Sequence, residues 1–188
     1  MEKKIVEKIV SQYLDIYPDE NNRIQPLLSY LNVQEESKIC DWNNTEGHLT
    51  AGGFIYSKKN KQFLVLWHKD LQMFLYPGGH CETSQNSPFD TAKNEVNEET
   101  GITKFAPVKL NNCDLVPFDI DIHKIPFNAR INMPEHYHFD FRYLFVVEDD
   151  QKITIDTDEL SSYKWIDCDE LKQDVNYGNI LRKIEKYL

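Results

Sequence analysis

Three glutamates in the middle of the chain have the residue type and spacing of a divalent-metal site. Glu98 and Glu99 follow Glu95 by three and four residues, so on a helix the three side chains emerge from one face about one turn apart. Like charges at this spacing repel one another and weaken a helix unless cations bind between them. Acidic runs are usually solvated surfaces, so the spacing alone leaves that alternative open.

A pair of glycines upstream of this helix favours the metal interpretation. Gly78 and Gly79 follow an apolar stretch, and a short polar loop joins them to the helix. A glycine turn lets a backbone carbonyl come close to a bound ion, and Mg²⁺ prefers oxygen ligands together with several retained waters. The turn and the carboxylate face together predict a metal cradle.

The ends of the glutamate helix are marked in the sequence. Ser87 can cap the N-terminus, Pro88 suits the first helical position, and Asp90 can complete a capping box. Gly101 is a natural left-handed cap at the C-terminus. The side of the helix opposite the glutamates is apolar and is formed by Phe89, Ala92 and Val96. This buried side fixes the direction in which the glutamates point.

The whole segment resembles the Nudix box, G-x(5)-E-x(7)-R-E-U-x-E-E-x-G-U. The matching stretches are PGGHCE at 77–82, SP at 87–88 and NEVNEETGI at 94–102. The resemblance implies that Mg²⁺ or Mn²⁺ is bound by Gly79, Glu95, Glu98 and Glu99. It also implies that Glu98 and Glu99 are catalytic, one of them as a candidate general base. The expected activity is a Nudix-type pyrophosphohydrolase that cleaves a diphosphate linkage in a nucleoside-diphosphate-linked or related small molecule.

The match departs from the motif in two places. The loop after Gly79 is one residue longer, so Gln85 or Asn86 stands where a glutamate is expected, and Asn94 replaces the motif arginine. In the family this glutamate and arginine are thought to pair. Losing both leaves no uncompensated charge, and an amide pair could substitute through weaker, neutral hydrogen bonds. The departures keep open a second function, a catalytically weakened Nudix-fold ligand-binding or sensor domain.

A second polar group lies on a later strand. Alternate residues share one face of a strand, so His136, His138, Asp140 and Arg142 point one way and four aromatic residues point the other. Such a polar face is costly to bury without purpose, so it should line a wet cleft or a hydrogen-bonded network. A preceding strand carries a similar face, formed by Asp119, Asp121 and His123. We expect the two polar faces to be neighbours.

These strands also resemble a bacterial Nudix subgroup. Its features here are the Gly-Gly-His box that ends at His80, the His-x-His-x-Asp strand, and a leading strand at 47–51. We expect His138 to be catalytic, as a hydrogen-bond donor or proton carrier. The expected substrate-binding residues are His80, His136, Asp140 and Arg142, with the arginine able to meet a phosphate bidentately. The alternative is that these groups only satisfy one another at the sheet edge. The loop residues Asp158 and Glu159 lie where some family members contribute another carboxylate.

Periodicity predicts the remaining elements. Helices are expected at 5–14, 24–30 and 169–187, the last broken near Gly178, and strands at 49–56, 63–68, 113–123, 136–147 and 163–166. The predicted fold is α/β, a Nudix-like α/β/α sandwich with a mixed β-sheet and an N-terminal helical extension. We expect residues 1–45 to form this extension, packed on the core, and residues 46–188 to form the hydrolase domain.

The amino-acid composition restricts the kinds of molecule that the protein is expected to bind. A net charge of -10 and a pI near 5.0 disfavour a nucleic-acid polymer, whose binders carry basic stripes, and leave a small-molecule diphosphate substrate. No apolar run reaches the roughly 20 residues that span a bilayer, and the start lacks a signal-peptide core. A cytoplasmic protein without membrane contact is expected. The helical extension could cover the core or form the contact of a homodimer, and the sequence does not decide between these.

The four cysteines form no Cys-x-x-Cys pair. Cys81 lies near the glycine turn, and the fold also supports diphosphate-linked isomerases that use a cysteine. A small buried thiol is the commoner explanation.

Overall fold

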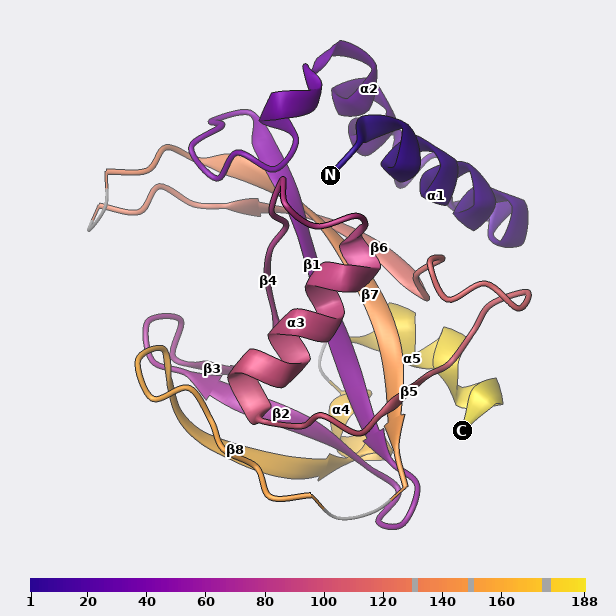
Figure 1. The fold of residues 1–188 in the computed structure, drawn as a ribbon, viewed down its shortest axis with the longest axis vertical. Helices are drawn as coiled ribbons and strands as arrows, with labels where there is room; N and C mark the ends of the chain where they lie inside the picture. The colour runs from indigo at the N-terminus through magenta and orange to yellow at the C-terminus, as the bar shows by residue number, and fades with distance from the viewer. Residues whose placement is uncertain (130–131, 149–150, 174–176) are drawn as a thin grey trace.

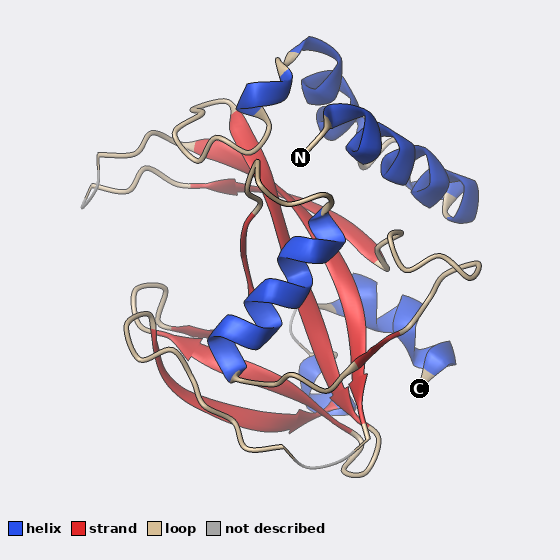
Figure 2. Cartoon of the chain, viewed as in Figure 1, coloured by secondary structure: helices blue, strands red, loops and turns tan. Residues whose placement is uncertain are grey.

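The computed structural model describes residues 1–129, 132–148, 151–173 and 177–188. These residues form the predicted α/β/α sandwich, in which helices lie on both faces of one mixed sheet (Figures 1 and 2). The strands are β1 Gly47–Ser57, β2 Gln62–His68, β3 Met73–Leu75, β4 Gly78–His80, β5 Ala106–Pro107, β6 Asp119–Ile125, β7 His136–Val147 and β8 Leu160–Asp167.

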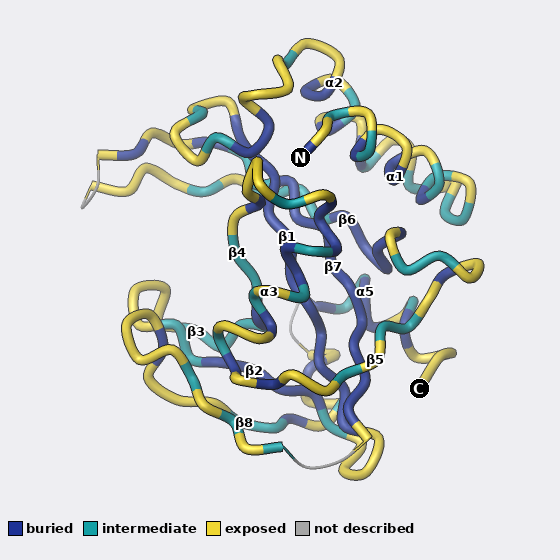
Figure 3. The backbone as a smooth tube through the Cα atoms, viewed as in Figure 1, coloured by how far each residue is buried: buried dark blue, intermediate teal, exposed yellow. Residues whose placement is uncertain are grey.

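Two long strands, β1 and β7, run side by side in parallel through the centre of the sheet. The main strand order is β3-β2-β1-β7-β5, while β4 pairs with β1, β6 with β7 and β8 with β2, all antiparallel. Every residue of β1 is buried, and Figure 3 shows the same of most of β7. Since β4 pairs with the first half of β1, it brings the glycine pair to the sheet edge.

The helices divide between the two faces and the N-terminal extension. Their bounds are α1 Lys3–Ile16, α2 Gln25–Val33, α3 Pro88–Thr100, α4 Cys168–Leu171 and α5 Gly178–Ile184, with short 3-10 turns at Pro18–Glu20, Glu36–Lys38 and Glu185–Tyr187. Helix α3 lies across one face (Figure 1). The ring of Tyr177, just before α5, contacts Phe54 and Tyr76 on the opposite face. Strand side chains alternate between these faces.

The N-terminal extension packs directly on the sheet. The Tyr30 hydroxyl of α2 donates to the Gly47 carbonyl at 2.7 Å, and its ring lies 4.5 Å from that of Phe139. Arg23, between α1 and α2, donates to the Asp119 carboxylate at 2.8 Å. Helices α1 and α2 both precede β1, as expected for an N-terminal extension. The exact boundary between this extension and the hydrolase domain, at residues 45 and 46, stays a prediction.

Several expected elements differ in extent. The β1–β2 hairpin is confirmed, but the strand expected from Cys113 begins at Asp119. Cys113 instead closes a tight turn with Leu110, in which Asn111 and Asn112 have positive φ angles. The expected glycine turn is instead strand β4. The last helix is two helices, α4 and α5, and its positions 174–176 lie outside the described residues. No helix in the described ranges is long and apolar enough to cross a membrane.

Candidate active site

The glutamate helix α3 has the predicted ends. The Ser87 hydroxyl accepts the Asp90 backbone N–H at 3.3 Å, and Gly101 terminates the helix with a φ of 70°. The Asp90 carboxylate accepts from the Ser87 hydroxyl at 3.1 Å rather than from the Ser87 backbone. The Phe89 ring packs 5.3 Å from that of Tyr143 on β7. The apolar side is therefore buried as expected, and the glutamates point away from it.

Helix α3 and strand β4 meet at the two glycines. The Gly78 backbone N–H donates to Oε2 of Glu99 at 2.9 Å. A Cβ on Gly79 would collide with the Glu95 carboxylate and force it to move, so glycine allows the carboxylate its present position against β4. Glu95 and Glu99 are half-buried, whereas Glu98 is exposed. The structure thus brings Gly79, Glu95 and Glu99 together, with Glu98 on the open side of the same helix.

The buried glutamates carry strongly raised pKa values. Burial, then the neighbouring Glu98 and Glu159 carboxylates, raise the pKa of Glu95 to about 7. Burial, then Glu95, raise the pKa of Glu99 to about 8, against the opposing effect of the Gly78 N–H. Within the described chain, no lysine, arginine or histidine forms an ion pair with Glu95, Glu98 or Glu99. Oxygen donors with uncompensated charge are a donor set that suits a hard divalent cation, so the residues fit the implied metal.

We expect the metal-free protein to lose stability as the pH rises from about 5 to about 8. The folded-state pKa values of Glu95 and Glu99 lie above the ordinary value of 4.5, so the native state binds protons more tightly than the unfolded chain. Their stabilisation is complete below the unfolded pKa and is lost as the pH passes through about 7 to 8. After allowance for solvent screening the loss is on the order of 2 kcal/mol, or ~5 °C in melting temperature.

Melting curves in EDTA measure this loss. The Glu99→Gln variant should show a smaller fall, because one titrating group is removed, whereas Glu7→Gln on the exposed surface of α1 should match the wild type. Saturating Mg²⁺ should flatten the wild-type curve. Equal pH slopes in wild type and Glu99→Gln would contradict the assignment.

The loop between β4 and α3 is tied to the helix by Gln85. Its side-chain oxygen accepts the Glu82 backbone N–H at 2.9 Å and also accepts the Thr91 hydroxyl. Asn94 is exposed on α3 and makes no side-chain hydrogen bond to the described residues. An amide pair between Gln85 and Asn94 is therefore wrong, because Thr91 is the partner. The loop keeps a tie to the helix where the motif's charged pair is missing.

Replacing Gln85 with alanine should loosen this loop. Two hydrogen bonds are lost, which lowers the free energy of unfolding by about 1–2 kcal/mol. We also expect the metal concentration needed for half-maximal activity to rise, because Gly79 is less firmly placed. Asn94→Ala is the matched control, and it should change neither quantity. Urea unfolding and metal-dependence curves measure both, and equal effects of the two variants would count against the tie.

The predicted polar strands are neighbours on the face opposite α3. Strand pairing places Asp119 opposite Arg142, Asp121 opposite Asp140, and His123 opposite His138. Thr50 on β1 donates to Asp140 at 3.1 Å. The expectation of adjoining polar faces is confirmed.

Arg142 lies inside this network and not at an open surface. It is 5% exposed, and its guanidinium meets the carboxylates of Asp121 at 2.8 Å, Asp140 at 3.0 Å and Asp119 at 3.5 Å. Its Nε also donates to the Tyr76 hydroxyl at 2.9 Å, and that hydroxyl donates to Asp140. In the structure the guanidinium of Arg142 is therefore paired with carboxylates of the protein itself. Sequence reasoning missed Tyr76, whose aromatic run gave no sign of a polar contact.

Histidines gather beside this network. The rings of His80, His136 and His138 all surround His48 of β1, at centroid distances of 4.7, 5.0 and 4.7 Å. Burial, then neighbouring histidines, lower the pKa of His138 to about 2 and that of His48 to about 3. His48 was missed, although its alternation with Thr50 matches that of His138 with Asp140.

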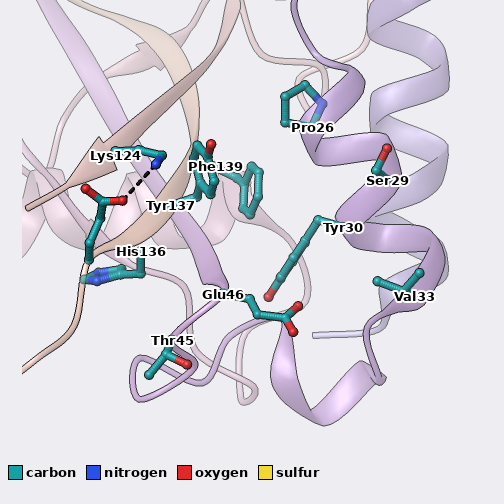
Figure 4. Close-up of a pocket in the computed structure, with 11 residues that line it drawn as sticks. Pro26, Ser29, Tyr30, Val33, Thr45, Glu46, Lys124, His136, Tyr137 and Phe139 are labelled. Carbon is teal, nitrogen blue, oxygen red and sulfur yellow. Dashed lines mark hydrogen bonds and ion pairs between the residues drawn. The ribbon is translucent and has the colours of Figure 1, made fainter.

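A separate pocket of about 480 Å³ opens between α2, the residues just before β1, and the first residues of β7. Figure 4 shows the Tyr30, Tyr137 and Phe139 rings lining it. Lys124, which also lines the pocket, forms an ion pair with Glu135 at 2.8 Å. His136 lies at its edge, but none of the α3 glutamates lines it. The pocket is therefore distinct from the glutamate site.

The mixed sheet, the Gly-Gly strand and the glutamate helix together define an α/β/α sandwich of the Nudix type. The NUDIX domain family model matches residues 47–185, and the chain belongs to the Nudix family. The predicted family and fold class are thereby confirmed.

Known proteins with similar sequence or structure agree with this assignment. The chain is 33% identical over 149 residues to the "Probable DHNTP pyrophosphohydrolase" of Lactococcus lactis subsp. cremoris (strain MG1363), covering 77% of this chain and 81% of that protein. A C. elegans Ap4A hydrolase structure aligns with a TM-score of 0.54 at 20% identity, covering 74% of this chain and 96% of that one. A Clostridium perfringens NUDIX-family hydrolase aligns with a TM-score of 0.54 at 22% identity, covering 73% and 94%. The family match and the Lactococcus relative confirm the prediction of a Nudix-type pyrophosphohydrolase.

Proposed function

We propose that the chain hydrolyses a diphosphate linkage in a nucleoside-diphosphate-linked or related small molecule, with Mg²⁺ or Mn²⁺ as cofactor. The observation that carries this proposal is the pair of buried, uncompensated carboxylates of Glu95 and Glu99 against the Gly78–Gly79 strand. The metal would be held by these two groups, Glu98 and the Gly79 carbonyl. When bound, it would supply positive charge for the diphosphate and lower the pKa of a water.

Residues around the metal position its ligands and accept a proton from water. The Gly78 N–H holds Glu99 in place, and the exposed Glu98 has access to solvent, which suits a general base that accepts a proton from water. Glu98 and Glu99 are both catalytic residues in this proposal. Glu159 lies close enough to raise the pKa of Glu95 and Glu99, which supports a role for this loop carboxylate at the same site.

The histidine face provides the substrate-binding surface in this proposal. His80 is exposed at the end of β4, next to Gly79 in the chain. Its side chain lies on the face of β4 opposite Glu95, so a substrate held at the glutamate site would reach it around the end of this strand. His136 and the catalytic candidate His138 lie next to His80 across β1. Asp140 and Arg142 are buried beneath them and contribute as positioning residues, since both are bonded within the network.

A panel of phosphoanhydrides tests the activity. The names of the Lactococcus pyrophosphohydrolase and the C. elegans Ap4A hydrolase suggest a pterin triphosphate and a dinucleoside polyphosphate, beside nucleoside triphosphates and nucleotide sugars. Each is incubated with Mg²⁺, Mn²⁺ or EDTA, and the products are separated by chromatography. Metal-dependent cleavage between phosphates supports the proposal. Binding of a compound without cleavage would favour the sensor domain, the alternative that the exposed Asn94 supports.

A further inference from the structure

Five of the six histidines in the sequence gather on the sheet face opposite α3. They come from four neighbouring strands, as His80 of β4, His48 of β1, His136 and His138 of β7, and His123 of β6. We propose that His48, His136 and His138 form a binding site for a transition-metal ion of the Zn²⁺ class. This site is separate from the glutamate site, because the side chain of His80 and the carboxylate of Glu95 lie on opposite faces of β4.

The ligand atoms have nearly the spacing that a bound ion requires. One ring nitrogen from each of the three histidines lies within 4.8 Å of the others. Nε2 of His136 and Nε2 of His138 are 3.3 Å apart. Two nitrogens ~2.0–2.1 Å from a tetrahedral ion are separated by ~3.3–3.4 Å, so this pair already has the geometry of two ligands. The ring of His48 needs to approach by less than about 1.5 Å to complete the set.

The tautomer of His136 is set by the contact that its Nδ1 makes with the backbone, on the side of the ring away from His138. Its Nδ1 lies 2.7 Å from the Pro134 carbonyl oxygen, which can only accept a hydrogen bond. Nδ1 of the neutral ring therefore carries the hydrogen, and Nε2 presents a lone pair toward His138. Metal-binding histidines typically have this outer hydrogen bond, which fixes the ring and raises its basicity.

His48 supplies an independent observation. It is 1% exposed, and neither of its ring nitrogens makes a hydrogen bond of normal geometry to the described residues, although the Asn44 backbone lies near enough to raise its pKa slightly against the larger effect of burial. A buried polar group without a partner costs about 1–3 kcal/mol. Its ring is surrounded by those of His80, His136 and His138, so an ion between these rings would give one of the two nitrogens a partner.

The donor set selects the kind of metal. Three neutral imidazoles suit Zn²⁺, Co²⁺, Ni²⁺ or Cu²⁺, whereas Mg²⁺ favours oxygen donors. Three protein ligands leave a fourth position for water or a substrate atom. His80 is at the exposed side of the cluster, next to Gly79. The exposed side of the cluster is therefore the surface that we assign to substrate.

Metal titration of the untagged, full-length protein tests the site. After EDTA treatment and dialysis into excess Mg²⁺, which competes for the glutamate site, we expect the histidine site to bind one equivalent of Zn²⁺ by calorimetry and by elemental analysis, in wild type and in Glu99→Gln alike. Co²⁺ should give the intense visible bands of a four-coordinate nitrogen site, without thiolate charge transfer. His136→Gln and His138→Gln should each weaken Zn²⁺ binding by ~100-fold or more, because a direct ligand exceeds the ~10–100-fold of an outer-shell partner.

Two controls separate this site from its surroundings. His68→Gln changes the one histidine outside the cluster, and Glu99→Gln disables the glutamate site; both should bind Zn²⁺ as the wild type does. Melting curves establish that each variant is folded, and the Co²⁺ spectrum of the wild type does not depend on any variant. Failure of wild type to bind Zn²⁺, or loss of binding in Glu99→Gln alone, would overturn the site. Absence of hydrolysis would leave these readouts unchanged, so the two proposals fail separately.

Discussion

Glu99→Gln should lower metal-dependent hydrolysis by ~100-fold or more while the protein stays folded. Glu99 is held by the Gly78 N–H and lies beside Glu95. A neutral amide binds a hard cation far less well than a carboxylate does, and each ~1.4 kcal/mol of lost transition-state stabilisation lowers the rate tenfold. The same change removes a repelling charge, so the metal-free variant should melt at a higher temperature than the wild type at pH 8. Lower activity together with higher stability is typical of a functional site.

Rates at several Mg²⁺ concentrations distinguish lost metal binding from lost chemistry. Glu98→Gln should also reduce turnover, yet it should leave stability almost unchanged because Glu98 is exposed. Glu7→Gln, an exposed change on α1, serves as the control for adding an amide. Full metal-dependent turnover in both Glu98→Gln and Glu99→Gln would remove the proposed metal site.

The sequence was sufficient to predict α3 and its glutamate face. Its cap at Ser87, its stop at Gly101 and its apolar side depend on local rules that act within a few residues. The glycine pair was harder, because glycine marks turns and close approaches alike. Only the tertiary position of Glu95 shows that Gly79 is a close approach within a strand.

The partners of buried polar side chains depended on strand order, which periodicity does not specify. Alternation placed His138 and Arg142 on one face, but the parallel pairing of β7 with β1 decided that His48 joins them. The distance in sequence between these strands hides the contact. For the same reason periodicity did not show that Arg142, which we expected to be able to bind a phosphate, is bonded to three aspartates in the structure.

Arg142→Met should destabilise the fold more than any other single change proposed for this protein. Methionine keeps much of the volume but leaves the buried Asp140 without its cation, and Asp121 without its 2.8 Å partner. Removing one partner of a buried ion pair costs about 3–5 kcal/mol, or ~10 °C in melting temperature for a chain of this size. Arg142→Lys should be intermediate, because the ammonium keeps the charge but lacks the guanidinium fork.

Urea unfolding at two pH values establishes whether uncompensated charge is the cause. Against the opposing effect of burial, His123 and Arg142 lower the pKa of Asp121, so the stabilisation that Arg142 provides through this carboxylate is present at pH 8 and fades as the pH falls. The loss in Arg142→Met should therefore be smaller at pH 4 than at pH 8. Adding Asp121→Asn should recover part of the loss, and a double-mutant cycle measures that coupling. Arg182→Met, on the exposed side of α5, controls for the loss of an arginine as such. A pH-independent loss equal to that of Arg182→Met would mean that the network contributes packing alone, and Arg142 would no longer be assigned the role of holding the histidine strand in position.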